Sequence, residues 1–179
     1  MTARTLVTRH FLVFLVFMLS GAAGLIYEIV WSRQLVLVFG NTTQAVSAIL
    51  TGFFGGMAIG AVIGGRIADR VRSPLRLYAY LEIALVAVVL VTPVTFGFIN
   101  AVYRGIYPSL EGTALLTLAR LALAVAALSP ATIMMGATFP ALVRHLARSA
   151  ELGQSFGRLY SVNTIGAVIG TLIAGMALI

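Results

Sequence analysis

The chain has 179 residues, of which 60% are hydrophobic and only 9% are charged. A soluble domain of this length carries far more charge, so the composition predicts an integral membrane protein and leaves no soluble domain that could bind nucleic acid. All 12 basic residues are arginines, against five acidic residues, and there is no cysteine. The absence of cysteine excludes disulfides and thiol–metal sites.

Five apolar stretches reach the length of about 20 residues that a membrane-spanning helix needs. In chain order they are 10–38, 44–65, 74–103, 113–146 and 157–179. The first, third and fourth exceed one bilayer thickness, so we expect them to tilt, kink or project. Pro93 and Pro130 are the expected kink points, because each proline removes a helical hydrogen bond. The sequence thus predicts one all-α transmembrane bundle over residues 1–179, with no soluble catalytic domain.

Arginine is distributed unevenly between the two ends of these stretches. The end that we assign to the cytoplasm has Arg4, Arg9, Arg66, Arg70, Arg72, Arg76, Arg144, Arg148 and Arg158. The other end has only Arg104, which Glu111 offsets. Because cytoplasmic loops of membrane proteins concentrate arginine and lysine, this asymmetry predicts a cytoplasmic N-terminus. We expect a multi-pass protein of the bacterial plasma (inner) membrane.

The N-terminal segment MTARTLVTRHFLVFLVFMLSGAAG also has the features of a signal peptide: basic residues, an apolar run and small residues at its end. Apolar character resumes at once with LIYEIVW, however, and this favours an uncleaved span over a cleaved signal.

The stretch YEIVWSR places charges near the outer end of the first span. At about 1.5 Å per helical residue, Glu28 and Arg120 lie within a helical turn of each other in depth, which suggests an ion pair, with Arg33 as a competing partner. Tyr27 and Trp31 are one turn apart, as in an interfacial aromatic anchor. The alternative is an outward-facing cation site, with Glu28 as counter-charge and the two rings as cation–π walls. A polyamine-like cation would suit that site.

A second polar position lies nearer the inner surface. Glu82 in the third span and Asn163 in the fifth have nearly the same predicted height, so Asn163 could donate a hydrogen bond to Glu82, as could Arg76 from below. The role of Glu82 is either structural or that of a proton relay or substrate contact. His10 and His145 lie at span ends without a second ligand at helical spacing, so we expect no metal site and no cofactor.

Glycine recurs at every fourth position in the second and fifth stretches. These glycines are Gly52, Gly56, Gly60 and Gly64, followed by Gly166 and Gly170. Such a ridge lets another helix, of this chain or of a partner subunit, approach closely. The hexapeptide IGAVIG occurs at 59–64 and again at 165–170. Inverted repeats of three helices each would make these two stretches equivalent. The alternative is a match by chance, because glycine, alanine, isoleucine and valine are common in membrane helices.

The segment GGRIADRVRSPLRL resembles the cytoplasmic loop signature of the major facilitator superfamily. Gly65, Asp69, Arg70 and Arg76 fit its pattern of glycine, three residues, Asp-Arg and a basic tail. The second glycine of the signature is missing, since Arg72 stands near that place. The resemblance implies most of one major-facilitator half.

Three further motifs resemble the membrane part of fused transporter-like spermidine synthases, the membrane-anchored polyamine aminopropyltransferase-like proteins. They are SGAAGLIYEIVWSRQLVLVFGNT, SPATIMMGATFPALVRHL and GRLYSVNTIGAVIGTLIAG. In that family the chemistry resides in a soluble Rossmann-like domain that follows the helices, and no glycine-rich strand–turn–helix of that kind occurs in this sequence. We therefore expect no catalysis by these residues. The chain would then be either a fragment of a longer protein, which we favour, or a stand-alone descendant that lost the enzyme.

Two functions follow as alternatives. In the first, the chain is the membrane module of an aminopropyltransferase-like protein, which anchors the enzyme and moves or senses polyamine-like amines. In the second, it is a non-catalytic accessory subunit that packs within a larger membrane complex through the glycine ridge.

Overall fold

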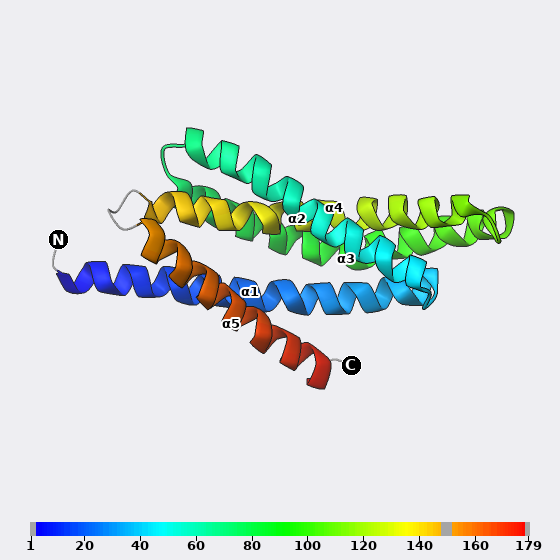
Figure 1. Ribbon diagram of the computed structural model, residues 1–179, viewed down its shortest axis with the longest axis horizontal. Helices are drawn as coiled ribbons and strands as arrows, with labels where there is room; N and C mark the ends of the chain where they lie inside the picture. The colour runs from blue at the N-terminus through cyan, green and yellow to red at the C-terminus, as the bar shows by residue number, and fades with distance from the viewer. Residues whose placement is uncertain (1–2, 148–151, 178–179) are drawn as a thin grey trace. The chain divides into compact units, whose positions relative to one another are not determined.

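The structure, a computed structural model, describes residues 3–147 and 152–177, with side chains from 11 in the first helix and from 156 in the last. The side chains of Arg4, Arg9, His10 and Arg148 lie outside this description. Over the described residues the chain forms five α-helices and no strand. The helices are α1 (Ala3–Phe39), α2 (Thr43–Arg70), α3 (Pro74–Leu110), α4 (Ala114–Leu146) and α5 (Leu152–Ala177) (Figure 1).

All five predicted spans are confirmed as helices that are long and apolar enough to cross a membrane. The chain is therefore an integral, multi-pass membrane protein by the length and composition of its helices. Four helices run further than predicted: α1 begins at Ala3 and α5 at Leu152, whereas α2 continues to Arg70 and α3 to Leu110. Hydropathy falls at charged residues, but arginine is a good helix former, so the helix does not end where the apolar stretch ends. The orientation in the membrane stays a prediction.

Local sequence explains where the helices end and how they pass their prolines. Gly40 and Gly112 adopt positive φ angles of 87° and 77° in the α1–α2 and α3–α4 turns, a conformation that favours glycine. Thr42 caps α2, since its side chain accepts a hydrogen bond from the Ala45 backbone N–H. Pro93 and Pro130 lie inside α3 and α4, and both helices continue through them.

The chain divides into two compact units by its internal packing. The first unit contains residues 1–31 and 146–179, and the second contains residues 32–145. Most of α1 thus belongs with α5, whereas the last two turns of α1 belong with α2, α3 and α4. The two units are described separately below.

In the second unit, the glycine ridge of α2 packs on α4. A Cβ atom built on Gly60 would overlap the carbonyl oxygen of Ile133, and one built on Gly64 would overlap Ala137. In the opposite direction, a Cβ on Gly136 of α4 would overlap the carbonyl oxygen of Met57. The two helix backbones are therefore in direct contact, an approach that only glycine permits.

In the first unit, α5 packs on α1 in the same manner (Figure 1, orange on blue). A Cβ built on Gly166 would overlap the carbonyl oxygen of Met18, and one built on Gly170 would overlap that of Ala22. A Cβ on Gly21 of α1 would in turn overlap the backbone oxygen of Asn163. Each unit thus contains one helix pair held together by glycine.

The two helix pairs match each other contact by contact. Each α5 residue lies 106 positions after its α2 counterpart, because 163 − 57, 166 − 60 and 170 − 64 all equal 106. Each α4 residue lies 115 positions after its α1 counterpart, because 133 − 18, 136 − 21 and 137 − 22 all equal 115. A chance hexapeptide would not bring its partner helix into the same register. The two IGAVIG helices therefore share the register of their glycine contacts, whereas their equivalence as inverted repeats stays a prediction.

One face of α3 is strongly apolar and exposed. Ile83, Val86, Leu90, Val94 and Phe98 recur at helical spacing and are each more than half exposed. In water such a stripe would be unfavourable, but the hydrocarbon of a bilayer solvates it. This face of the second unit therefore suits contact with lipid.

Candidate functional site

Arg120 is the central residue of the candidate site. It lies in α4, and its side chain is 9% exposed. A buried guanidinium requires hydrogen-bond acceptors, because transfer of an unpaired charge out of water is costly. The Nε of Arg120 donates to the Tyr103 hydroxyl at 3.1 Å, and its Nη1 donates to the Thr42 hydroxyl at 3.3 Å. Both acceptors are neutral.

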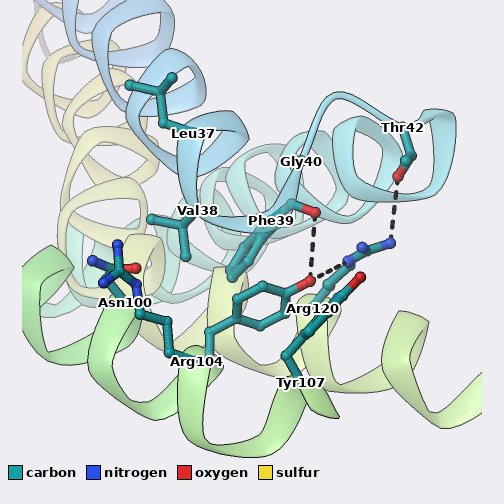
Figure 2. A pocket seen from close by; sticks show the side chains of 10 residues that line it. Leu37, Val38, Phe39, Gly40, Thr42, Asn100, Arg104, Tyr107 and Arg120 are labelled. Atoms are coloured by element: carbon teal, nitrogen blue, oxygen red, sulfur yellow. Dashed lines mark hydrogen bonds between the residues drawn. The ribbon is translucent and has the colours of Figure 1, made fainter. Parts of the chain in front are cut away.

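Tyr103 connects Arg120 to the end of α1. The Tyr103 hydroxyl donates to the carbonyl oxygen of Phe39 at 3.5 Å, and the two rings pack edge to face with centroids 5.0 Å apart. Phe39 is the last residue of α1, where the helix leaves its carbonyl groups without intrahelical donors. The Tyr103 oxygen therefore accepts from the arginine while its proton points to this carbonyl (Figure 2).

These groups line a pocket of about 480 Å³ within the second unit. The last turn of α1 supplies an apolar wall of Leu37, Val38 and Phe39. The polar lining residues are Thr42, Asn100, Tyr103, Arg104, Tyr107 and Arg120. Figure 2 shows Arg104 beside Asn100 on one side of the pocket and Arg120 reaching Thr42 on the other. The described lining residues thus include two arginines and no acidic residue.

One acidic residue of the second unit bonds a side chain that lines the pocket. Glu111, in the α3–α4 turn, accepts a hydrogen bond of 2.7 Å from the hydroxyl of Tyr107. The Glu111 side chain is exposed, and it is not among the residues that line the pocket. It anchors Tyr107 and does not bond Arg120.

The predicted aromatic pair occurs in the first unit. Tyr27 and Trp31 stack with ring centroids 5.2 Å apart and an interplanar angle of 13°. Parallel rings at this separation leave no space for a cation between them, so a cation site would have to use an outer ring face. Their role, with that of Glu28, stays a prediction.

Both predicted polar partnerships join residues of different units. Glu28 belongs to the first unit and Arg120 to the second, and Asn163 belongs to the first and Glu82 to the second. The two proposed contacts therefore stay predictions. What the structure adds is local: Arg120 bonds two hydroxyl groups in its own unit, and Asn163 packs against Gly21 in its own unit.

The residues of the loop signature surround the junction between α2 and α3. Asp69 forms an ion pair with Arg144 of α4, with 3.2 Å between its Oδ1 and the arginine Nε. Both side chains are largely exposed. Gly65 lies near Pro140 of α4, whereas Arg70 ends α2 and Arg76 is in the first turn of α3. This signature therefore joins the same ends of α2 and α4 that the glycines bring together.

The glycines predicted as a packing ridge are buried inside the chain. Gly52, Gly56, Gly60 and Gly64 face α4, and Gly166 and Gly170 face α1. The ridge is thus covered by the protein's own helices, and it offers no exposed face to a partner subunit.

Sequence reasoning missed the partners of Arg120. Tyr103 and Tyr107 are one helical turn apart near the end of α3, and Thr42 follows a glycine turn. Polar residues that gather near the ends of adjacent helices are the signal that could have identified them.

Comparison with protein-family models, with curated proteins and with solved structures finds no match.

Proposed function

We propose that the chain is a transporter-like membrane module that serves as the membrane part of an aminopropyltransferase-like protein, where it anchors the enzyme and moves or senses polyamine-like amines. The observation that supports this most is the matched register of the two glycine-packed helix pairs. Internal repeats of this kind are typical of secondary transporters, in which one repeat moves against the other around a central site. The three sequence motifs supply the link to the aminopropyltransferase-like proteins.

Amine movement is tested with the purified chain in proteoliposomes. We expect saturable uptake of radiolabelled spermidine above that of protein-free liposomes. If Glu28 is the counter-charge of an amine site, Glu28→Gln should reduce uptake while the protein stays folded. Glu111→Gln is the matched control, because it removes the same charge from an exposed turn. Absence of amine uptake and of amine binding in the wild type would show that the amine function is wrong.

Orientation is tested by cysteine accessibility, for which the chain offers a cysteine-free background. With a cytoplasmic N-terminus, Ser73→Cys in the α2–α3 turn should react only after the membrane is made permeable. Thr43→Cys at the start of α2 should react with a membrane-impermeant maleimide from outside. Reaction at Thr43 from the cytoplasmic side alone would reverse the orientation.

A further inference from the structure

The pocket around Arg120 is positively charged and does not suit a cation. Its ligand would therefore differ from the amine of the proposed function. The described lining of the pocket includes two arginines and no acidic residue. Like charges repel at close range, so a polyamine would be unfavourable there. We propose that this pocket binds a phosphate oxyanion, with the guanidinium of Arg120 as its main donor.

Arg120 retains donors for such a ligand. A guanidinium has five N–H groups in a fixed planar fork. The two hydrogen bonds to Tyr103 and Thr42 use one donor on Nε and one on Nη1. Three donors remain, on Nη1 and Nη2, which is enough for the paired contacts through which arginine binds phosphate oxygens.

The neighbours of Arg120 hold it in place without neutralising it. Tyr103 is itself fixed by its bond to the Phe39 carbonyl, and Thr42 is fixed as the cap of α2. Within this unit the buried positive charge therefore meets only neutral acceptors. A buried charge of this kind is stabilised when an anion supplies the opposite charge. A preorganised guanidinium also loses little freedom when the anion binds.

The remaining lining fits one polar group with an apolar extension. Arg104 adds a second positive charge on the side of Asn100, while Leu37, Val38 and Phe39 form the apolar wall. A pocket of about 480 Å³ is large enough for a phosphate group and part of the molecule that carries it. The phosphate can belong to a lipid headgroup or to a free phosphate ion. The two sources share this chemistry, and the experiment below separates them.

The test measures the thermal unfolding midpoint of the full chain in a neutral detergent. One arm adds sodium phosphate, with sodium chloride at equal ionic strength as reference, so that screening is the same in both. The other arm adds short-chain phosphatidylglycerol, with short-chain phosphatidylcholine as reference. We expect a saturable rise of the midpoint in at least one arm, because a ligand that binds only the folded state stabilises it. A rise in the lipid arm alone identifies a headgroup, and a rise with phosphate identifies a free ion.

Arg120→Gln should weaken the apparent affinity by about tenfold or more, since it removes hydrogen bonds to a charged group. Arg66→Gln is the matched control, because Arg66 is an exposed arginine of α2 outside the pocket, and it should bind as the wild type does. If Arg120→Gln does not fold, Arg120→Lys and Tyr103→Phe replace it. The first keeps the charge without the fork, and the second removes the hydroxyl that orients Nε.

Three outcomes would overturn the proposal. The first is no rise in either arm for the wild type. The second is an unchanged affinity in Arg120→Gln, or in both replacement variants. The third is a rise that appears only in Glu28→Gln, because that carboxylate would then neutralise Arg120 in the wild type. None of these outcomes depends on whether the chain moves amines.

Discussion

The two glycine-packed helix pairs share one register but differ in how far their contact extends. In α2 the ridge continues toward the start of the helix, where a Cβ on Gly52 would approach Ala124 and one on Gly56 would overlap Thr132. The α5 residues 106 positions later are Arg158 and Val162. The α2–α4 pair therefore stays closed over four glycines, whereas α5 has bulky residues at the first two of these positions.

At this level the first unit has a cleft between the two helices. Arg158 and Val162 of α5, with Phe11, Phe14, Leu15 and Met18 of α1, line a cavity of about 460 Å³. Gly166 and Gly170 of α5, together with Gly21 of α1, thus hold this pair in the same register without further glycines in α5. The side chains at the next two positions decide whether the pair closes or opens a cavity.

The largest effect is expected where a glycine faces the backbone of its partner. Gly60→Ala and Gly166→Ala should each destabilise the protein by about 1–3 kcal/mol, because the added methyl group overlaps a main-chain carbonyl that cannot rotate away. The measurement is thermal unfolding in detergent. If the two pairs are equivalent, both substitutions should lower the midpoint by similar amounts.

Gly97→Ala provides the matched control in a helix. A Cβ at Gly97 would meet nothing within 4 Å, so alanine should leave stability unchanged or raise it slightly. A fall as large as that of Gly60→Ala would show that the loss comes from the substitution itself and not from the helix contact.

A smaller and recoverable effect is expected at Gly56. There the Cβ of alanine would overlap the side-chain oxygen of Thr132, and the partner backbone lies further away. Thr132→Ala removes this oxygen, so the double variant should recover about 1 kcal/mol of the loss. In contrast, Ile133→Ala should not rescue Gly60→Ala, since the obstacle there is a main-chain carbonyl. Equal rescue in both cases would contradict the distinction between side-chain and backbone contact.

The helices could be predicted from the sequence, but most of their partners could not. Hydropathy locates an apolar segment, and glycine spacing indicates that a helix has a flat face. Neither says which helix covers that face, because both describe one helix at a time. Only the repeated hexapeptide contained information about a second helix, and the glycine contacts of α2 and α5 share one register at that hexapeptide.

The candidate site shows the same limit. Depth along the membrane normal placed Arg120 near Glu28, yet depth is one coordinate and does not determine lateral neighbours. Within its unit, Arg120 donates hydrogen bonds to Tyr103 and Thr42. A hydropathy profile does not distinguish these two residues from other residues near helix ends. Arg120 itself was found because a charge inside a long apolar stretch needs a partner or a purpose.

The smallest effect is expected at the ion pair that supplements the glycines of α2 and α4. Asp69 and Arg144 are 67% and 44% exposed, so water and salt screen their attraction. Asp69→Asn should therefore lower stability by only about 0.2–1 kcal/mol, a loss that shrinks as salt is added. The measurement is the unfolding midpoint of wild type and variant at low and high ionic strength. The α5 position 106 residues after Asp69 is Gly175, which has no charge, so the first unit has no equivalent of this pair. A loss from Asp69→Asn as large as that from Gly60→Ala would mean that charge, and not backbone contact, holds α2 against α4.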